Sequence, residues 1–462
     1  MVSTSIDTPR VVIAAPASGH GKTTVATGLI AAFARRGRRV APFKVGPDYI
    51  DPGYHALAAG RPGRNLDPFL VGESRTVGVF AHGAAGADIA VVEGVMGLYD
   101  GAVGRGEFAS TAQVATLIGA PVILVVDATA QGRSVAALVD GFRGFDRRVR
   151  IAGVVLNRVG SDRHREILAA ALDEIGVPLL GTLHRSDAVA TPSRHLGLVP
   201  VAERAPEALA TVDALADLIA ENLDLDRIER IAGSAPAADG PAWSPEDAIA
   251  ECGGPASGRP VVAVAGGAAF TFSYAEHAEL LQAAGAEVVT FDPLRDAKLP
   301  ERASALVIGG GFPEVYASEL AQNLSLMHDV QGFAQSGGVI AAECAGLLYL
   351  AKSLNGERMC DLIAADAVMS ERLTLGYREA VAATDSVLCG TGTRVNGHEF
   401  HRTKLVPAAS DEPAWMWRAH DGAKVAEGYA SARLHASYLH LHWAGAPELP
   451  LRVVTAAAKG AT

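Results

Sequence analysis

Cysteine is scarce in this chain of 462 residues, and its spacing fits no cross-linked or metal-binding framework. The four cysteines stand far apart, without a C-x-x-C pair, at Cys252, Cys344, Cys360 and Cys389. This pattern excludes a disulfide scaffold and a zinc ribbon. Aromatic residues are also few, at 6%, which argues against a surface built to stack nucleic-acid bases.

Basic charge and long apolar runs are lacking as well. Lys and Arg number 40 against 51 Asp and Glu, and the net charge of −11 argues against binding to nucleic acids or anionic membranes. No apolar run approaches the ~20 residues that cross a bilayer. The N-terminal residues MVSTSIDTPR lack a basic start followed by an apolar core, so we expect no signal peptide. The prediction is a soluble cytoplasmic protein with reduced thiols and no nucleic-acid or membrane partner.

What the sequence does contain is a succession of short apolar runs separated by helical patterns. Mostly apolar stretches typical of buried parallel strands occur at residues 11–15, 89–92, 122–126, 151–156, 261–265, 287–291, 305–308 and 339–342. Because such strands alternate with helices, we expect an α/β protein with mostly parallel sheets that are covered by helices on both faces.

A stretch rich in small residues, Pro and Gly interrupts this pattern at residues 232–241. The apolar strands resume after it, so each half of the chain is expected to have a sheet of its own. The sequence therefore predicts two domains, residues 1–225 and residues 259–450, joined by an Ala/Pro/Gly-rich linker over residues 226–258.

The loop between the first strand and the first helix predicts a phosphate-binding loop of the P-loop NTPase type. The loop and the helix start contain, in order, Gly19, Gly21, Lys22, Thr23 and Thr24. Backbone N–H groups would face the phosphates of ATP, Lys22 would neutralise their charge, and the Thr23 hydroxyl would ligate Mg²⁺. The strict pattern has Gly six positions before the Lys, where this chain has Pro16. An ordinary strand–turn–helix junction is the alternative.

Acidic residues follow the predicted strands at the same sheet edge. Asp48, Glu93 and Asp100 come after strand ends, where carboxylates line the ligand crevice of an open α/β sheet. All three are predicted to act in catalysis. Mg²⁺ on a triphosphate takes one or two carboxylates besides the loop hydroxyl, so Asp48 and Glu93 are predicted metal ligands together with Thr23. Solvated turn acids are the alternative, and the role of Asp51 stays undecided.

A second candidate site surrounds Cys344, which separates an apolar strand from a helix start. A Cys on a sharp strand-to-helix turn projects from the sheet near a helix N-terminus, which lowers the pKa of its thiol. Another strand ends in three glycines, residues 309–311, whose N–H groups would form an oxyanion hole. A core cysteine is the alternative.

Histidines late in the chain supply candidate general bases for this thiol. His440 and His442 are two residues apart, so on an extended strand both would point to the same face. His398 and His401 compete for the role. The residues alone therefore leave the identity of the base open.

These motifs together resemble known families. The N-terminal half resembles the dethiobiotin-synthetase-like ATPases, whose phosphate loop also lacks the first glycine. The C-terminal half resembles class I glutamine amidotransferase α/β domains of the cobyric-type subgroup. Joined in one chain, they resemble the cobyrinic acid a,c-diamide synthases and their cobalt-free counterparts, which act on hydrogenobyrinic acid. The most specific stretches are residues 42–52, 93–101, 194–198, 342–344, 397–401 and 437–442.

The resemblance implies a ligase of cobalamin biosynthesis with ATP and L-glutamine as co-substrates. It would amidate the a and c acetate carboxylates of a corrinoid polycarboxylate. In such enzymes the counterpart of Cys344 attacks the glutamine amide, and His440 would be the base. The oxyanion hole would lie at Gly310, Gly311 and Ala345. The released ammonia would react in the ATPase domain with an acyl phosphate formed from ATP·Mg²⁺.

The chain departs from the amidotransferase pattern at several positions. His442 stands where a Glu usually follows the catalytic His. Ala342, Ala345 and Arg402 replace the Gly, Gly and Tyr that related sequences carry. In the ATPase half, Asn157 matches a position that contacts adenine, although an Asn that forms a turn is the alternative.

Two other functions fit part of the sequence. A cobyric-acid-type synthase would carry out the same chemistry on another polycarboxylate. A P-loop ATPase switch with an appended binding domain would explain the phosphate loop, but it gives no reason for Cys344 and His440. The sequence leaves open whether the ring already contains cobalt and whether the chain forms a homodimer. Arg61 and Arg64 are candidate anchors for further substrate carboxylates, with solvated charges as the alternative.

Overall fold

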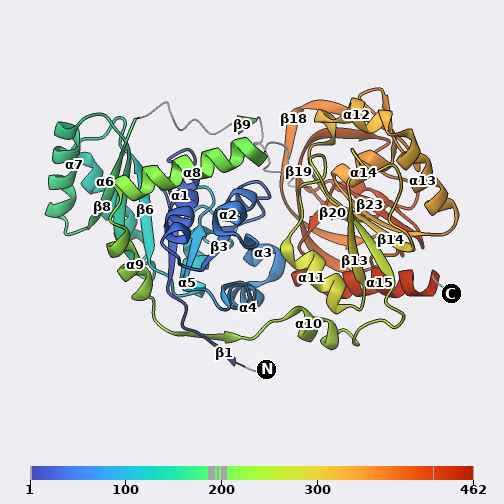
Figure 1. Ribbon diagram of the computed structural model, residues 1–462, viewed down its shortest axis with the longest axis horizontal. Coiled ribbons are helices and arrows are strands. Elements are labelled where there is room, and N and C mark those ends of the chain that lie inside the picture. The colour runs from blue at the N-terminus through green and yellow to red at the C-terminus, as the bar shows by residue number, and fades with distance from the viewer. Residues whose placement is uncertain (1–2, 186–192, 195–196, 199–204, 420, 461–462) are drawn as a thin grey trace. The chain divides into compact units, whose positions relative to one another are not determined.

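Residues 3–185, 193–194, 197–198, 205–419 and 421–460 are described by the computed structural model of the chain (Figure 1). The chain divides into two units, Met1–Trp243 and Ser244–Thr462. Each unit has its own parallel sheet, as the alternation of strands and helices predicts. None of the described helices is both long and apolar enough to cross a membrane.

The central sheet of the first unit consists of parallel neighbours. Nearly all residues of its inner strands are buried, which explains their continuous apolar sequences. In spatial order the strands are β4 (Arg64–Leu66), β3 (Val40–Val45), β5 (Ile89–Glu93), β2 (Arg10–Ala14), β6 (Val122–Asp127), β7 (Ile151–Val159) and β8 (Leu179–His184). The carboxyl ends of β2, β3 and β5 meet at one sheet edge, where the phosphate loop begins.

The first helix packs closely along a helix from much later in the chain. Figure 1 shows α1 (Lys22–Arg35) and α8 (Ala205–Asn222) side by side. Gly28 permits this approach, because a Cβ there would collide with Ile219 of α8. The other helices of this unit are α2 (Asp51–Ala59), α3 (Pro68–Val71), α4 (Glu73–Ala84), α5 (Thr111–Leu117), α6 (Ser134–Phe145), α7 (Asp162–Glu174) and α9 (Leu225–Gly233).

A short antiparallel pair lies in the stretch 194–198 that the sequence singled out. It is formed by β9 (Ser193–Arg194) and β10 (Gly197–Leu198). His195 and Leu196 lie outside the described residues.

The segment predicted as a linker, residues 226–258, is not irregular. It contains most of α9, the strand β11 (Ala238–Pro241) and the helix α10 (Pro245–Glu251). Ile228 on the apolar face of α9 is fully buried, and β11 pairs with β1 (Ser3–Ile6). The Pro and Gly residues that pointed to a linker stand near the ends of these elements. The boundary between the two units falls after Trp243, inside this segment.

The second unit contains a mainly parallel sheet and a mainly antiparallel one. The parallel sheet runs in the order β13 (Glu287–Phe291), β12 (Val261–Ala265), β14 (Ala303–Ile308), β15 (Val339–Glu343), β23 (Leu434–Ser437) and β22 (Tyr429–Ala430), the last of them antiparallel. The other sheet is built around the long hairpin partners β18 (Ile363–Ala382) and β19 (Arg394–Val406). Its further strands are β16 (Ala351–Leu354), β17 (Glu357–Arg358), β20 (Trp415–Arg418), β21 (Lys424–Glu427) and β24 (His440–Leu441). The expectation of mostly parallel sheets did not include this antiparallel sheet.

The chain passes from one sheet to the other between β23 and β24. β23 is the parallel neighbour of β15, whereas β24 pairs with β19 of the antiparallel sheet. His440 therefore belongs to the antiparallel sheet, while Cys344 follows β15 of the parallel sheet. The helices around them are α11 (Ala275–Ala283), η3 (Pro313–Val315), α12 (Ala317–Gln322), α13 (Leu324–Gln335), α14 (Ala345–Leu350), η4 (Trp443–Gly445) and α15 (Glu448–Gly460).

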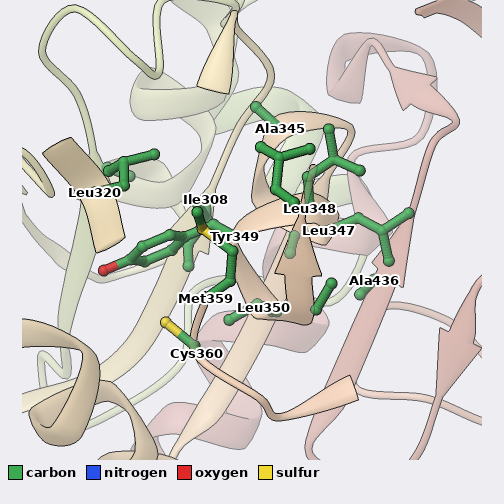
Figure 2. Close-up of a cluster of buried hydrophobic side chains, with 14 of the residues drawn as sticks. Ile308, Leu320, Ala345, Leu347, Leu348, Tyr349, Leu350, Met359, Cys360 and Ala436 are labelled. Carbon is green, nitrogen blue, oxygen red and sulfur yellow. The ribbon is translucent and has the colours of Figure 1, made fainter. Parts of the chain in front are cut away.

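A cluster of buried apolar side chains fixes the turn at Cys344. Every residue of α14 is buried, and Figure 2 shows Leu347, Leu348 and Tyr349 of this helix within the cluster. Ile308 of β14 and Met359 belong to the same cluster. Because the whole helix packs into a dense core, the turn that precedes it is held in place.

Candidate active sites

The phosphate loop is held by a side chain of the neighbouring strand β7. Nδ2 of Asn157 donates a hydrogen bond to the carbonyl oxygen of His20 at 2.9 Å, and its Oδ1 accepts one from the Arg158 N–H at 2.9 Å. Gly19 and Gly21 have φ values of 81° and 99°, and a Cβ on Gly21 would collide with Asn157. Asn157 thus shapes the loop, and its contact with adenine stays a prediction.

Lys22 is the first residue of α1 and points back across the loop. Its Nζ donates hydrogen bonds to the carbonyl oxygen of Ala17, at 3.2 Å, and to that of Met96. Burial lowers the pKa of Lys22 to about 8, and the nearby Lys44 contributes to the shift. A buried cation gains strongly from an anionic partner, so this position suits the predicted role of Lys22 toward phosphate. Thr23 and Thr24 follow in the first turn of the helix.

Glu93, at the end of β5, is fully buried beside a lysine, a histidine and a hydroxyl. Its Oε1 accepts hydrogen bonds from Thr23 Oγ1 at 2.6 Å and Lys44 Nζ at 2.8 Å. Its Oε2 lies 2.8 Å from Nε2 of His55. Burial alone would raise the pKa of Glu93, but Lys44 and His55 hold it well below its usual value. Glu93 is therefore ionised and ties the phosphate loop to β3 and α2.

Lys44 connects this carboxylate with two aspartates at the start of α2. Its Nζ lies 2.6 Å from Oδ2 of Asp51 and 3.9 Å from Oδ2 of Asp48. Burial would lower the pKa of Lys44, but Asp51 and Glu93 raise it above its usual value. Lys44 and His55 were not among the predicted site residues. For Lys44 the sequence does contain a signal, because a lysine stands inside the otherwise apolar strand β3.

The donors at this sheet edge suit Mg²⁺ only in part. Thr23 Oγ1 and the carboxylate oxygens of Asp48 and Asp51 are hard oxygen ligands, and Asp48 is 34% exposed. Glu93, in contrast, has both oxygens engaged by Lys44 and His55. Within the described residues, no group of at least three His, Cys, Asp and Glu side chains is arranged to hold a metal ion. Any bound Mg²⁺ would therefore need the phosphates of ATP for most of its ligands.

Asp100 and Arg61 have local partners that define their positions. Oδ2 of Asp100 accepts the Gly97 N–H at 2.9 Å, and the turn they form packs on the phosphate loop through a hydrogen bond from Leu98 N–H to Ala15 O at 2.8 Å. Asp100 thus shapes a turn beside the loop, and its predicted catalytic role stays a prediction.

Arg61 donates a hydrogen bond to the carbonyl oxygen of Gly83, in the last turn of α4, at 2.7 Å. This contact fixes the position of its guanidinium group.

Cys344 occupies a strained turn between β15 and α14. Its φ of 48° is unusual for a residue with a side chain, and such a conformation costs roughly 1–3 kcal/mol. Its N–H donates to the carbonyl oxygen of Ser437 in β23 at 2.7 Å. The prediction of a lowered thiol pKa is wrong: burial raises the pKa of Cys344 well above its usual value, and Glu314 and Glu343 add to the shift. The thiol is therefore protonated at neutral pH and needs a base.

Two of the three predicted oxyanion donors face the sulfur. The backbone N–H groups of Ala345 and Gly311 hydrogen-bond to the Cys344 thiol and oppose the rise of its pKa. Gly310 is a correction, because its N–H donates to the carbonyl oxygen of Phe272 at 3.2 Å and is not available to an oxyanion. Gly310 instead makes room for the base, since a Cβ there would lie 2.5 Å from Cε1 of His440.

His440 is the histidine that lies beside the nucleophile turn. It is fully buried, and its Nδ1 lies 3.9 Å from Oε2 of Glu343, the residue before Cys344. Burial lowers the pKa of His440 well below its usual value, and other histidines, foremost His398, add to the shift. The imidazole is therefore neutral, which is the form that accepts a proton.

Of the competing histidines, His442 and His401 are held by other partners, whereas His398 lies opposite His440 in the pairing of β19 with β24, with 6.1 Å between the ring centroids. His442 caps η4, stacks on Tyr274 at 4.2 Å between ring centroids, and places Nε2 3.6 Å from Oε2 of Glu276. His401 stacks on Tyr438 at 3.8 Å between ring centroids, and its Nδ1–H donates a hydrogen bond to the carbonyl oxygen of Thr403 at 2.9 Å. β24 ends at Leu441, but the backbone of His442 is still extended, so the expectation that His442 shares the face of His440 stays a prediction.

Comparisons with known proteins agree with this division of the chain. Residues 11–199 match the CobQ/CobB/MinD/ParA nucleotide binding domain, and residues 261–448 match the CobB/CobQ-like glutamine amidotransferase domain. A protein of Streptomyces coelicolor, named hydrogenobyrinate a,c-diamide synthase, is 57% identical over 96% of this chain and 97% of its own length. A protein of Thermobifida fusca with the same name is 51% identical over 97% and 96%. A Synechococcus protein named cobyrinate a,c-diamide synthase is 43% identical over 95% and 96%.

Among solved structures, chloroplast FtsY from Physcomitrella patens is similar over 45% of this chain and 65% of its own, with 17% identity and a TM-score of 0.31. A likeness of that degree bears on neither fold nor function. The full-length relatives and the two domain matches carry the comparison.

Proposed function

This chain belongs to the family of hydrogenobyrinate and cobyrinate a,c-diamide synthases, and we propose from that premise that its acceptor is hydrogenobyrinate. The chain is a ligase of cobalamin biosynthesis that amidates the a and c acetate carboxylates with nitrogen from glutamine. The relatives reported as hydrogenobyrinate synthases are 51–57% identical, whereas those named for cobyrinate are 41–43% identical. This difference in identity is the observation that favours the cobalt-free ring.

Glutamine hydrolysis is assigned to the second unit. The neutral imidazole of His440 takes the proton of the Cys344 thiol, and the thiolate attacks the amide carbon of glutamine. The N–H groups of Gly311 and Ala345 stabilise the oxyanion that forms. The imidazolium returns its proton to the leaving nitrogen, so ammonia departs and a glutamyl thioester remains. Water then hydrolyses the thioester and releases glutamate.

Activation of the acceptor is assigned to the phosphate-loop unit. A carboxylate is a poor electrophile, and transfer of the terminal phosphoryl group of ATP converts it into an acyl phosphate. Lys22 and Lys44 offset the negative charge of the phosphates, and Asn157 keeps the loop in shape for them. Ammonia then attacks the acyl carbon, and inorganic phosphate leaves. Thr23 and Asp48 are the residues that would hold Mg²⁺, which supplies further charge neutralisation when bound.

The proposed acceptor is tested with both rings side by side. The purified chain is incubated with ATP and amide-¹⁵N-glutamine, and with hydrogenobyrinic acid or cobyrinic acid. Mass spectrometry should find two labelled amide groups on hydrogenobyrinic acid at a higher kcat/KM than on cobyrinic acid. A higher kcat/KM with cobyrinic acid would overturn the choice of substrate. If neither ring is labelled, the acceptor is another polycarboxylate and the proposed substrate is wrong. ATP hydrolysis without any amide transfer would favour the switch-type function instead.

We also infer a cytoplasmic location, because ATP and glutamine are drawn from that compartment. Fractionation of cells that express a tagged chain would test it directly, and recovery of the chain with membranes would overturn it.

A further inference from the structure

We propose that Glu343 is a positioning residue of the glutaminase site, whose carboxylate orients His440 and takes the place of the Glu that otherwise follows the base. The proposal rests on the proposed glutamine hydrolysis and adds a third member to its pair of Cys344 and His440. Sequence reasoning did not single out Glu343, because it precedes the nucleophile and stands far from His440 in the chain.

Glu343 and His440 approach each other from different sheets. Glu343 ends β15 and His440 begins β24, and Oε2 of the former lies 3.9 Å from Nδ1 of the latter. The N–H of Leu441, next to the base, donates a hydrogen bond to the Glu343 carboxyl group. This second contact also joins the carboxyl group to β24, the strand that carries the base.

The position of Glu343 couples the base to the nucleophile. It directly precedes Cys344, whose own N–H is bonded to Ser437 of the adjoining strand. The end of β15 therefore positions both the sulfur of Cys344 and the carboxyl group of Glu343. A carboxylate at Nδ1 keeps the ring proton on that nitrogen, so the lone pair of Nε2 is left for the thiol proton. A separation of 3.9 Å exceeds a hydrogen bond, and such contacts commonly tighten when substrate binds.

The residue at the usual position of the orienting acid is engaged elsewhere. His442 packs its ring on Tyr274 and faces Glu276, at 3.6 Å, on α11. Its neighbour His277 contacts the carbonyl oxygen of Leu441 at 3.0 Å. These contacts fix the chain after β24 to α11. Glu343 is the carboxyl group that, within the described part of the chain, forms an ion-pair contact with Nδ1 of His440.

The charge of Glu343 provides a measurable signature. Burial raises its pKa to about 8, and the Leu441 N–H opposes this shift. Glu343 borders a cavity of about 40 Å³ whose wall includes His277 of α11 and His435 of β23. Burial lowers the pKa of both histidines to about 3, so neither titrates near pH 8. Other titratable groups around the pair are Cys344, Glu314 of η3 and, beside His440, His398 and His401 of β19.

Glu427 is a matched control for this titration. It is a buried glutamate of the same unit, and burial raises its pKa to about 8 as well. Its carboxyl group accepts hydrogen bonds from Ser437 Oγ at 2.6 Å and from the Tyr438 N–H at 2.8 Å, so its partners lie in β23 and in the residue that follows it. A titration near pH 8 that belongs to Glu343 should survive the change Glu427→Gln.

The test measures kcat/KM for glutamine hydrolysis between roughly pH 6 and 10. In the wild type it should rise with a midpoint near pH 8, because the carboxylate form of Glu343 supports the imidazolium. Glu343→Gln should remove this rise and lower kcat/KM at high pH by about 10²-fold. This loss is smaller than the ~10⁴-fold loss seen when the orienting carboxylate of a Ser-His-Asp triad is replaced by an amide, which leaves the histidine in the wrong tautomer. Glu343→Asp should keep the rise at a reduced rate. Glu427→Gln should keep it at nearly full rate.

The proposal is overturned if Glu343→Gln keeps the wild-type rate and the wild-type pH dependence of kcat/KM. It is also overturned if the rise near pH 8 is lost in Glu427→Gln but kept in Glu343→Gln. Circular dichroism on heating checks that each variant is folded. If Glu343→Gln does not fold, the Glu343→Asp profile decides, and loss of the rise in that folded variant counts against the proposal. A wild-type chain that does not hydrolyse glutamine would instead overturn the proposed function itself.

Discussion

Nε2 of His55 lies 2.8 Å from Oε2 of Glu93, and both side chains are completely buried. Lys44 and Thr23 occupy the other carboxylate oxygen, at 2.8 Å and 2.6 Å. Glu93 is therefore an anchor that joins α2, β3 and the start of α1 at the phosphate loop. Its influence on the reaction is expected to pass through the placement of Lys44 and Thr23.

Replacing His55 by Ala should destabilise the first unit. The change leaves one oxygen of a buried carboxylate without its neighbour and opens a cavity, so the free energy of unfolding should fall by about 2–3 kcal/mol. Urea unfolding followed by circular dichroism measures the effect. His184→Ala, at the exposed end of β8, is the control and should change stability little. Equal stability of both variants would contradict the anchoring role of His55.

The same variant should respond differently to acid. The pKa of Glu93 in the folded chain lies below its ordinary value of 4.5, so its interactions stabilise the fold above pH 4.5. This contribution is lost as the pH falls below 4.5 and Glu93 takes up a proton. In His55→Ala part of it is already missing, so the loss of stability on acidification should be shallower. A steeper loss than in the wild type would contradict the assigned direction.

Lys22→Ala should remove the ATP-dependent step and leave the thiol site intact. Amidation with ammonia should become undetectable, while a glutamine-mimicking electrophile such as 6-diazo-5-oxo-L-norleucine should still modify Cys344. Because the pKa of Lys22 is about 8, kcat/KM for ATP at saturating ammonia should decline above that pH as the cation loses its proton. Lys22→Arg keeps its charge and should not show this decline. Undiminished amidation in Lys22→Ala would refute the phosphate-loop assignment.

Cys344→Ser should separate the two half-reactions. The variant should lose glutamine hydrolysis and glutamine-dependent amidation, because a hydroxyl is a much weaker nucleophile than a thiolate. Amidation driven by a high concentration of ammonia should persist, since the phosphate loop belongs to the other unit. Cys389→Ser, a buried cysteine outside the turn, is the matched control. Equal loss of ammonia-driven amidation in a folded Cys344→Ser variant would show that the sites are not separable.

His440→Ala and His442→Ala should differ in glutaminase activity. A correctly placed base contributes ~10²–10⁴-fold, so His440→Ala should lose activity on that scale. His442→Ala should lose much less, because its ring packs on Tyr274 and faces Glu276. Both variants should retain ammonia-dependent amidation. Rates in the reverse order would assign the base to His442.

Features that depend on neighbours in sequence could be predicted best. The loop before α1 and the turn at Cys344 lie between an apolar strand and a helix start, and those local signals determine where they form. The buried lysine of β3 was overlooked because a single polar residue barely alters an apolar run. His55 was also overlooked, but for another reason. Its partner Glu93 is distant in the chain and comes near only when β3 and β5 pair.

Features that depend on distant contacts could not be predicted from these signals. The thiol pKa follows from burial and from Glu314 and Glu343, not from the helix N-terminus alone. The amide of Gly310 is taken up by Phe272, a partner that no spacing rule reveals. The segment after residue 225 was predicted as a linker from its composition, although buried residues such as Ile228 give α9 an apolar face.

The nucleophile and its predicted base stand on different sheets, and only Tyr438 and Leu439 connect the two strands β23 and β24. The pair therefore forms only after the parallel and antiparallel sheets have both assembled and docked. A nascent chain that stops short of residue 440 carries the thiol but has no partner to deprotonate it. With His440 as the base, we therefore expect that an incomplete chain does not hydrolyse glutamine.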